Sequence, residues 1–542
     1  MRIALSQINS HLGDFETNSK KILEQIQSAK DRHCDLVVFP ECALMGYHPV
    51  DLLEQPYVVE AQLKALKKIE TSIPDGITAL VGIIAINPNK VGKPFLNSAI
   101  LISKNKPSKL FSKQLLPTYD VFDEGRHIEP GETAKNFFKF KGQNVLVTIC
   151  EDIWAWPQRG GHRYQTYGKN PLTQIPKSKV DLVLNLSASP YIPKKQKERQ
   201  LVVKQTATHF NAPMVYVNMV GAQDELIYDG GSFAVDSKGK ILAQACHFEE
   251  DLAILDLEKN EGSKKPLVTH EMESIRQAAV LGLKDFVSKS GFEKVHLGLS
   301  GGIDSALVAC LAVDALGPQN VKAFLLPGPY TSPLSNQLAQ KLCENLGIES
   351  HSLSINTGFE VLAEELNEKL GPLEFGLTHE NLQARIRGNF LMAISNLKGS
   401  LLLGTSNKSE LAVGYSTLYG DLCAGLLPIG DLLKTQVFEL AKHYNSEHEL
   451  IPLEIITRPP TAELRENQKD EDSLPPYDQL DPVVYKIVEK VKTPKSDLEK
   501  RIYNMMMKSE FKRWQAAPIL KLSSHAFGRG RRLPITGAYI YP

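Results

Sequence analysis

The sequence VHLGLSGGIDS, residues 295–305, decides how the second half of this 542-residue chain folds. Residues 295–299 form an apolar run that predicts a short buried strand, and the Ser-Gly-Gly that follows predicts a sharp turn into a helix from Ile303. The first N–H groups of a helix have no partner within it, so this turn is suited to bind an anion, and its glycines let a phosphate approach the backbone. Asp304 is compatible with phosphate only if a cation such as Mg²⁺ lies between the two.

The spacing of the glycines excludes two commoner phosphate loops. A Walker A loop requires a lysine, which is absent here, and Gly298, Gly301 and Gly302 do not have the G-x-G-x-x-G spacing of a dinucleotide-binding turn. The complete SGGIDS sequence resembles the SGGxDS pyrophosphate loop of the N-type ATP pyrophosphatases. These enzymes cleave ATP to AMP and pyrophosphate while they adenylate an acceptor.

Length and composition limit the class of protein and its partners. A chain of 542 residues is long for one hydrophobic core, so we expect at least two domains. The formal net charge of +0 provides no basic excess, and we expect neither a nucleic-acid nor a membrane partner. Seven scattered cysteines without a C-x-x-C pair predict neither a disulfide framework nor a zinc site. With no signal-peptide core or bilayer-spanning apolar run, the sequence predicts a cytoplasmic protein with reduced thiols.

Residues 1–260 predict an α/β layered domain, because strand patterns alternate with helical ones such as residues 16–32. Strands are expected at residues 2–8, 35–39, 79–86, 98–103, 144–148, 181–186 and 213–218, followed by a hairpin at residues 233–244. Three chemically reactive residues stand at the ends of such strands: Glu41 after VVFP, Lys113 in LFSKQLLP, and Cys150 in VTICEDIW. A thiol becomes an effective nucleophile beside a base and a positive charge. Singly, the three residues have ordinary interpretations as a turn cap, a surface cation and a buried thiol.

The same three residues, with their flanking P-E, K-x-x-L-P-T-Y and C-E-D-I-W segments, resemble the Glu-Lys-Cys set of the nitrilase (carbon–nitrogen hydrolase) superfamily. The resemblance implies an αββα sandwich in which Glu41 is the general base, Lys113 stabilises the oxyanion and Cys150 is the nucleophile. Glu124 matches a further acidic position with a supporting role. In members that use glutamine, the residues that hold the amino acid correspond to Tyr119, Ser189 and Lys195.

The second half predicts a different α/β domain. Residues 258–266, EKNEGSKKP, are polar and predict a linker to a domain at residues 265–542. Strands are expected at 295–299, 320–326, 350–355 and 400–403, and helices at 272–290, 303–316, 336–346 and 381–396. This alternation predicts a doubly wound parallel sheet that binds its ligand at the carboxyl ends of the strands. The proline-rich, charged segment 458–481 predicts a mobile loop or lid.

This second half resembles the synthetase domain of the NAD⁺ synthetases, with its adenine nucleotide alpha hydrolase-like fold, through ENLQARIRG, LLLGTSNKSE, YGD and PPTAELRENQ. The resemblance implies that the phosphates of ATP are held by Gly298, Leu299, Ser300, Gly301, Gly302, Ile303, Asp304 and Ser305. It implies further ATP contacts from Thr405, Lys434 and Thr461, and Mg²⁺ ligation by Asp304 and Glu410. It implies deamido-NAD⁺ contacts from Asn381, Arg385, Glu410, Lys512 and Lys521.

The chain departs from the family pattern at three positions. Phe511 replaces the histidine that precedes the lysine in small members, which is why both Lys512 and Lys521 are candidates. Leu418 and Gly425 replace a lysine and an aspartate of the small ammonia-using members, so we expect the nicotinate end to be held differently. Arg387, two residues after Arg385, is either a solvated side chain or a ligand for an acidic group.

The two resemblances together imply one reaction. Ammonia released from L-glutamine would amidate deamido-NAD⁺ through an adenylated intermediate, and AMP, pyrophosphate and glutamate would be the other products. Because ammonia is largely protonated in neutral water, we expect a protected channel between the two sites. The resemblance also implies a homo-oligomer through paired synthetase domains. Two alternatives remain open: another glutamine-dependent adenylating amidotransferase, or a chain in which one domain is only a binding module.

Overall fold

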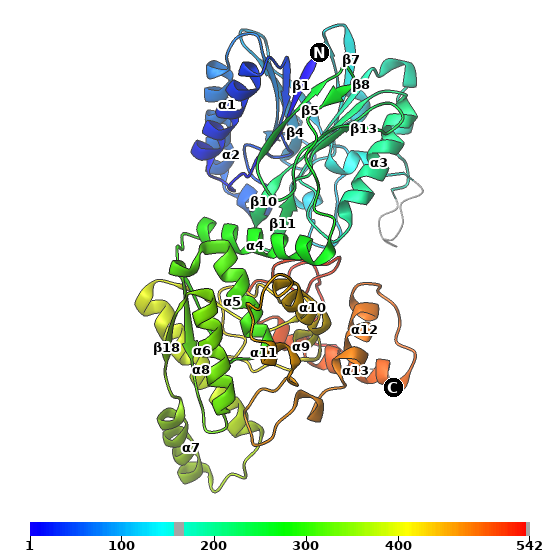
Figure 1. The fold of residues 1–542 in the computed structure, drawn as a ribbon. Helices are drawn as coiled ribbons and strands as arrows, with labels where there is room; N and C mark the ends of the chain where they lie inside the picture. Colours follow the sequence, from blue (N-terminus) through cyan, green and yellow to red (C-terminus); the bar gives the residue numbers. More distant parts are fainter. Residues whose placement is uncertain (157–166, 538–542) are drawn as a thin grey trace. The chain divides into compact units, whose positions relative to one another are not determined.

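The computed structural model describes residues 1–156 and 167–537 of the chain, which divides into two compact units, Met1–Thr269 and His270–Pro542 (Figure 1). The boundary lies after the segment 258–266 that was predicted as a linker. Part of that segment, Glu261–Gly262, pairs with the neighbouring strand of unit 1. Lys265 forms a 2.7 Å ion pair with Asp251 in the same unit. These contacts attach most of the predicted linker to unit 1.

Unit 1 contains two large sheets. The first has the strand order β15-β14-β1-β2-β3-β4-β5, and the second has the order β13-β12-β9-β8-β7-β6. The strands of the first are β1 (Arg2–Gln7), β2 (Leu36–Val38), β3 (Thr78–Ile86), β4 (Phe95–Ser103), β5 (Lys109–Ser112), β14 (Asp251–Asp256) and β15 (Glu261–Gly262). The strands of the second are β6 (Phe137–Phe140), β7 (Gln143–Ile149), β8 (Leu182–Ser187), β9 (Met214–Asn218), β12 (Phe233–Val235) and β13 (Ile241–Gln244). A separate hairpin joins β10 (Val220–Gln223) to β11 (Leu226–Asp229).

The two sheets pack face to face between helices, which confirms the predicted αββα sandwich. The helices are α1 (Phe15–Asp31), α2 (Pro56–Ser72) and α3 (Lys195–Phe210). Figure 1 shows α1 and α2 beside the first sheet and α3 beside the second. Successive side chains of a strand point to opposite faces, so Leu5 joins the core between the sheets with Leu184, whereas Ala4 joins a second core with Ile22 of α1.

Unit 2 is built on a four-stranded sheet in the order β18-β17-β16-β19, with every neighbouring pair parallel. The strands are β16 (Val295–Gly298), β17 (Val321–Leu325), β18 (Glu349–Ser352) and β19 (Leu401–Leu403). The helices are α4 (Glu271–Lys289), α5 (Ile303–Leu316), α6 (Pro333–Leu346), α7 (Asn356–Leu370), α8 (Leu377–Lys398), α9 (Lys408–Val413), α10 (Lys434–Tyr444), α11 (Leu453–Thr457), α12 (Tyr477–Val488), α13 (Asp497–Lys508) and α14 (Glu510–Arg513). The predicted parallel α/β sheet is therefore confirmed.

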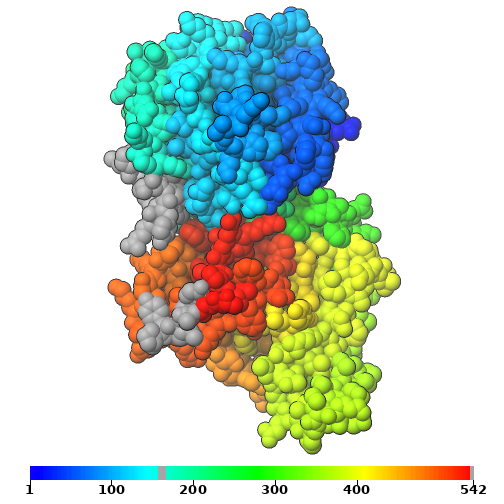
Figure 2. Space-filling model, turned by 180° about the vertical axis from the view of Figure 1, so that it is seen from behind, coloured from blue at the N-terminus to red at the C-terminus, as the bar shows by residue number. Residues whose placement is uncertain are grey.

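Two segments of unit 2 differ from their predicted structure. The strand expected at residues 350–355 ends at Ser352, and the unpredicted helix α7 begins at Asn356. The predicted loop 458–481 ends earlier, because α12 begins at Tyr477. The C-terminal segments after α12, orange to red in Figure 2, form much of the visible surface of this unit. Among the described residues, no helix is long and apolar enough to cross a membrane.

Helix α8 shows which end of the unit 2 sheet can hold a ligand. His296 of β16 contacts the carbonyl oxygen of Leu391 in α8 at 3.0 Å, so α8 covers the face of the sheet that carries His296. Because α8 precedes β19 in the chain, its last turn lies near the amino end of that strand. Its first half therefore lies near the carboxyl ends, where ligands bind in such sheets.

Candidate active site

The centre of the candidate site in unit 1 is Lys113, which directly follows β5. Its Nζ lies 2.7 Å from Oε1 of Glu41 and 2.6 Å from Oε1 of Glu124. The side chains of Lys113 and Glu41 are fully buried, and that of Glu124 nearly so. Two carboxylates and one ammonium are therefore held together away from water, where their mutual attraction is strong. The structure brings together three of the residues that the nitrilase resemblance singled out.

Neutral donors fix both carboxylates in place. Asn97 of β4 donates to Oε1 of Glu41 at 2.7 Å, and the backbone N–H of Ala188 donates to Oε2 at 2.9 Å. The hydroxyl of Tyr47 donates to Oε1 of Glu124 at 2.7 Å. Burial raises the pKa of Glu41, while the charge of Lys113 opposes the rise. A carboxylate with a raised pKa is a better proton acceptor, which suits a general base.

Cys150 lies at the turn that follows β7, and its backbone is in the left-handed region with φ of +41°. This conformation is uncommon for a residue with a side chain and occurs often at functional sites. Burial raises the pKa of the Cys150 thiol, Glu41 raises it further, and Lys113 opposes both. The resting thiol therefore keeps its proton beside a carboxylate that can accept it.

Asp152 attaches the Cys150 turn to the segment that carries Lys113. Its Oδ1 accepts hydrogen bonds from the backbone N–H groups of Gln114 at 3.0 Å and Leu115 at 2.9 Å. Its Oδ2 accepts from the N–H of Ile149 at 3.0 Å. Burial raises the pKa of Asp152 to about 6, although the three N–H groups favour the ionised form. Our sequence reasoning did not identify this residue, although it lies within the quoted C-E-D-I-W segment.

A second acidic residue, next to Cys150 in the chain, accepts hydrogen bonds from two tyrosines. Glu151 receives the hydroxyl of Tyr119 at 3.1 Å and that of Tyr167 at 2.8 Å, one on each carboxylate oxygen. Tyr119, one of the predicted glutamine-binding residues, is thus joined to the residue that follows Cys150. Glu151 is another site residue that the sequence analysis missed.

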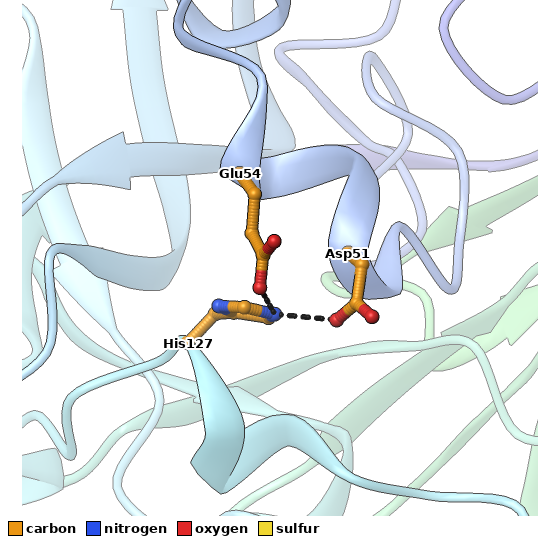
Figure 3. Close-up of side chains that lie close together, drawn as sticks. All are labelled: Asp51, Glu54 and His127. Carbon is orange, nitrogen blue, oxygen red and sulfur yellow. Dashed lines mark hydrogen bonds and ion pairs between the residues drawn. The ribbon is translucent and has the colours of Figure 1, made fainter.

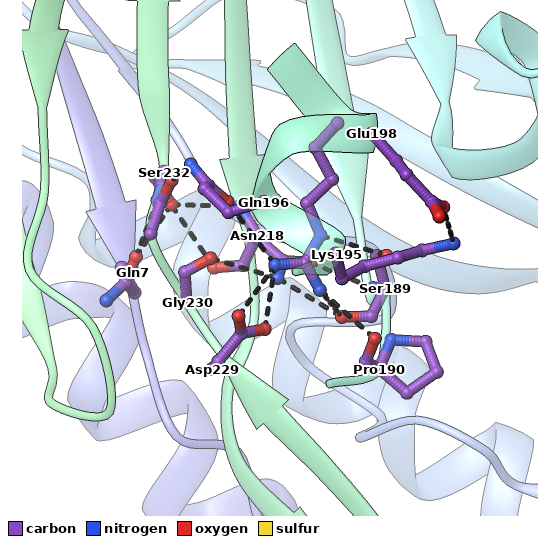
Figure 4. A network of polar contacts seen from close by, with 12 residues as sticks. Gln7, Ser189, Pro190, Lys195, Gln196, Glu198, Asn218, Asp229, Gly230 and Ser232 are labelled. Carbon is purple, nitrogen blue, oxygen red and sulfur yellow. Dashed lines mark hydrogen bonds and ion pairs between the residues drawn. The ribbon is translucent and has the colours of Figure 1, made fainter. Parts of the chain in front are cut away.

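The predicted pair Ser189 and Lys195 is held by different partners (Figure 4). Lys195 Nζ lies 2.8 Å from Glu198 Oε2 and 4.5 Å from the ring centroid of Trp154. The hydroxyl of Ser189 accepts a hydrogen bond from Nε of Arg199 at 3.2 Å. Ser189 lies in the loop after β8, and Lys195 is the first residue of α3. The basic side chain that is hydrogen-bonded to Ser189 is that of Arg199, not that of Lys195.

Arg199 of α3 organises this side of unit 1. It is fully buried, pairs with Asp229 at 2.8 Å, and donates to the carbonyl oxygen of Ser189 at 2.8 Å. Asn218 donates to the same carbonyl oxygen, at 3.2 Å. An arginine in a helix pattern is usually a solvated side chain, so nothing in the local sequence distinguished Arg199. Only the tertiary packing of α3, which contacts β9 and β12, brings Arg199 to these partners.

The phosphate-loop turn of unit 2 has the predicted strand-turn-helix structure, between β16 and α5. The N–H of Gly302 donates to Oγ of Ser300 at 3.2 Å, and Oγ of Ser305 donates to the carbonyl oxygen of Gly302 at 3.1 Å. Gly301 has φ of +75°, and a Cβ there would lie 2.2 Å from the carbonyl oxygen of Ser335. Gly301 must therefore be glycine, because both its conformation and its neighbour exclude a side chain.

Lys434, at the first position of α10, connects the two acidic residues predicted to hold Mg²⁺. Its Nζ forms a short ion pair with Oδ2 of Asp304 and lies 3.2 Å from Oε1 of Glu410. Asn407 donates to the other oxygen of Asp304 at 2.9 Å. The pKa of Glu410 is raised to about 8, because burial and the charge of Asp304 together outweigh the opposing charge of Lys434. Glu410 also accepts the N–H of Asn407 at 3.5 Å, as in a helix capping box.

The residue types at this cluster fit Mg²⁺. Carboxylate oxygens are its preferred protein ligands, and it usually takes only one or two of them together with phosphate oxygens and waters. Asp304 and Glu410 provide two carboxylates at the edge of the phosphate loop. Burial, and to a smaller extent the charge of Asp304, disfavour ionised Glu410, and a divalent cation bound there would favour it.

A group of acidic residues and a histidine in unit 1 differs from the Asp304–Glu410 pair. Asp51, Glu54 and His127 have potential metal-ligand atoms within 4.8 Å of one another (Figure 3). Nε of Arg126 lies 2.8 Å from Oδ1 of Asp51, and both acidic side chains are more than half exposed. Arg126 already forms ion pairs with both carboxylates, so we interpret the group as a surface ion-pair cluster.

Three residues predicted to contact deamido-NAD⁺ meet at one segment, residues 414–418. Asn381 accepts a hydrogen bond from Thr417 Oγ1 at 2.7 Å, and Nε of the exposed Arg385 donates to the carbonyl oxygen of Leu418 at 3.2 Å. Lys512 Nζ donates to the carbonyl oxygens of Gly414 at 2.8 Å and Ser416 at 2.7 Å. The structure thus joins Lys512 to the other two predicted contacts.

Three remaining predicted residues lie in their own local surroundings. Lys521 Nζ donates to the carbonyl oxygens of Ser523 at 2.7 Å and Ser524 at 2.9 Å. Thr461 donates to the carbonyl oxygen of Gln468 at 2.6 Å within the 458–481 segment. Thr405 is half-buried in the turn between β19 and α9.

The comparisons with known proteins cover both units. The carbon-nitrogen hydrolase family model matches residues 2–264, and the NAD synthase family model matches residues 275–516. The chain is 45% identical to the glutamine-dependent NAD(+) synthetase of Synechocystis sp. over 99% of both chains. It is 39% identical to that of Thermotoga maritima over 100% of this chain and 99% of the relative. The structure of glutamine-dependent NAD+ synthetase from Acinetobacter baumannii in complex with adenosine diphosphate has a TM-score of 0.78, at 36% identity over 98% of each chain.

Proposed function

The chain belongs to the family of glutamine-dependent NAD(+) synthetases, and from this premise we propose that it converts deamido-NAD⁺ to NAD⁺ with nitrogen from L-glutamine. ATP would be cleaved to AMP and pyrophosphate. The observation that carries the proposal is the buried Glu41–Lys113 pair beside Cys150, because it supplies amidase chemistry in a chain whose other unit has a pyrophosphate loop.

In unit 1, the geometry supports a thioester mechanism. Glu41 accepts the proton of Cys150 as the thiolate attacks the amide carbon of glutamine, and Lys113 stabilises the oxyanion that forms. Collapse of this intermediate breaks the C–N bond, with a proton returned to the leaving nitrogen. Ammonia departs and water then hydrolyses the thioester to glutamate. We assign Tyr119, Ser189 and Lys195 to binding the amino-acid end of glutamine.

In unit 2, adenylation converts a poor electrophile into a reactive one. The nicotinate carboxylate attacks the α-phosphorus of ATP, pyrophosphate leaves, and ammonia then displaces AMP from the acyl carbon. We assign the phosphates to residues 298–305, with Thr405, Lys434 and Thr461 as further ATP contacts. Asp304 and Glu410 would hold Mg²⁺, which would neutralise phosphate charge.

We assign the dinucleotide acceptor to the group around residues 414–418. Asn381, Arg385 and Lys512 already share partners there, which supports a common role. Glu410 and Lys521 are assigned as further contacts from the family resemblance alone.

We also propose that the chain works as a cytoplasmic homo-oligomer through its synthetase units. Helix α7 has no buried side chain, and its Val361 and Leu370 are 60% and 71% exposed. Such an apolar surface is suited to a second copy. All seven cysteines are unpaired, as expected in a reducing compartment. A protected path for ammonia is tested by adding labelled ammonium during glutamine-driven turnover: full dilution of the product nitrogen would contradict a channel.

The replacement Cys150→Ala tests how the two units divide the reaction. We expect NAD⁺ synthesis driven by glutamine to disappear and synthesis driven by ammonium to persist, because only the first requires the nucleophile. Cys246→Ala is the matched control, since its thiol is in unit 1, lies 3.9 Å from the carbonyl oxygen of Glu249, and is not part of the Glu41–Lys113–Cys150 set. If a folded Cys150→Ala protein lost both reactions, the division of labour would be wrong. If the unmodified protein made no NAD⁺ from either nitrogen source, a different acceptor would be indicated.

A further inference from the structure

Two arginines near the phosphate loop have no role in the reaction described above. Arg458 follows α11, and Arg387 lies in the first half of α8. Both side chains are half-buried, yet neither forms an ion pair with any residue that the structure describes. A guanidinium removed from water without a counter-ion is unfavourable, and proteins usually pair it with a carboxylate or a phosphate.

Arg458 is bonded directly to the phosphate loop. Its Nη2 donates to the carbonyl oxygen of Gly301 at 2.6 Å, and its Nη1 donates to Oγ of Ser335 at 2.9 Å. Both acceptors are neutral. The guanidinium of Arg458 is therefore held against the Gly301 turn. A phosphate oxygen would be a stronger hydrogen-bond acceptor than either of these two neutral groups.

Arg387 approaches the same edge of the sheet from α8. Its Nε donates to the carbonyl oxygen of Leu326, just beyond the carboxyl end of β17, at 2.9 Å. A Cβ on Gly328 would lie 2.8 Å from Nη2 of Arg387, so the glycine makes room for the guanidinium. Burial lowers the pKa of Arg387 to about 10. The site thus keeps a cation that its surroundings do not neutralise.

Glu463 is the acidic residue that acts on both Arg387 and Arg458. Its charge raises the pKa of each arginine, whereas burial lowers it. Its carboxylate is occupied by other donors: the hydroxyl of Ser335 at 2.6 Å and the N–H of Ser332 at 3.3 Å. The carboxylate of Glu463 therefore interacts with both guanidinium groups at a distance and forms an ion pair with neither in the described part of the chain. These three residues together carry a net positive charge, and they adjoin a turn suited to anions.

We propose that Arg387 and Arg458 bind the polyphosphate of ATP and the pyrophosphate released from it. On binding, Arg458 exchanges the carbonyl oxygen of Gly301 and the hydroxyl of Ser335 for phosphate oxygens, and Arg387 adds a second cation from α8. The inference rests on the proposed function, because it requires ATP at residues 298–305. It extends the set of phosphate contacts to the 458–481 segment and to α8.

The test compares ligands with and without phosphate on the full chain. Calorimetry with ATP, pyrophosphate and adenosine is carried out on the unmodified protein, Arg387→Gln, Arg458→Gln and Lys398→Gln. We expect each arginine variant to bind ATP and pyrophosphate at least about tenfold more weakly, with adenosine affinity unchanged, since a lost charged hydrogen bond costs about that much. Lys398→Gln, an exposed charge at the end of the same helix, should bind all three ligands normally. In steady-state assays, KM for ATP should rise while KM for deamido-NAD⁺ stays constant.

Each other outcome overturns the inference in a recognisable way. Equal loss of adenosine and pyrophosphate affinity would show that the arginines only support the fold. Normal pyrophosphate affinity in both variants would reject the inference while leaving the proposed function intact. Failure of the unmodified protein to bind either nucleotide or pyrophosphate would reject both. If Arg458→Gln does not fold, Arg458→Lys keeps the charge but loses the fork, and unchanged pyrophosphate affinity in that variant would count against a direct contact.

Discussion

Each unit holds a lysine between two carboxylates, but the two clusters differ in exposure. In unit 1, the side chains of Glu41 and Glu124 are 0% and 2% exposed around Lys113. In unit 2, those of Asp304 and Glu410 are 18% and 15% exposed around Lys434. The first cluster is completed by neutral donors such as Asn97, whereas the second faces the phosphate loop. One charge pattern therefore occurs in two settings: a closed set that suits the proton transfer proposed for unit 1, and a more open set that suits the cation and phosphate proposed for unit 2.

Replacing the central lysine of each cluster should produce the largest difference in stability between the two clusters. Lys113→Met leaves two buried carboxylates uncompensated and should lower the free energy of unfolding by about 3–5 kcal/mol. Lys434→Met should cost less, because its partly exposed carboxylates retain water. Urea unfolding of both variants measures the difference, and glutamine-driven synthesis should vanish in the first. Equal losses of stability would show that exposure does not distinguish the clusters.

Asp304→Asn should abolish NAD⁺ synthesis with either glutamine or ammonium, because adenylation precedes the use of nitrogen from any source. The protein should remain folded, since the variant removes one of two neighbouring negative charges. Turnover with both nitrogen donors, alongside the glutaminase reaction of unit 1, measures this. The exposed Glu293, between α4 and β16, provides a control through Glu293→Gln. Synthesis retained in Asp304→Asn would refute the metal role.

The raised pKa of Glu410 predicts that the stability of unit 2 depends on pH. Its carboxyl ionises near pKa 4.5 in the unfolded chain but near 8 in the folded one, so the folded state binds more protons between these values. The free energy of unfolding should therefore fall as pH rises through this window, and Glu410→Gln should remove that part of the slope. Denaturant unfolding at about pH 5 and pH 8 without divalent cations measures it. A slope identical in the variant would contradict the assignment.

Magnesium binding sharpens the same prediction. A cation that requires ionised Glu410 must displace its proton, so titration with Mg²⁺ near neutral pH should release protons. Calorimetry in buffers with different ionisation enthalpies counts them, and Glu410→Gln should release fewer. Proton release unaffected by this variant would place the cation elsewhere.

The smallest expected effect is a change in KM for deamido-NAD⁺ that differs between variants of Lys512 and Lys521. Lys512→Gln should raise KM for deamido-NAD⁺ by about tenfold, the cost of one charged hydrogen bond, because Lys512 shares the 414–418 segment with Asn381 and Arg385. Lys521→Gln should change this constant less, since Lys521 donates to Ser523 and Ser524. The reverse ranking in steady-state assays would reassign the contact.

Short-range patterns account for what could be predicted. The Gly301 turn depends on backbone conformation and on the strand and helix directly beside it, so SGGIDS predicted its shape. Helix α7 was missed although Phe359, Leu362, Leu366 and Leu370 recur at helical spacing, since the interpretation of this region stopped at the strand expected at residues 350–355. Strand β15 was read as a linker because EKNEGSKKP has no strand pattern, and only its pairing with β14 makes it a strand.

By itself, the sequence determined the two α/β architectures and the residue types of both reactive sets, because apolar periodicity and turn chemistry act over a few residues. The tertiary structure decided which side chains meet: Asp152 joins Cys150 to the Lys113 segment, Arg199 holds Ser189, and Lys434 bridges carboxylates 130 and 24 residues away in the chain. The tertiary structure also decided how much of each buried charge is balanced by opposite charges and hydrogen-bond partners. Burial and long-range contacts set that balance, and neither is encoded in the local spacing of residues.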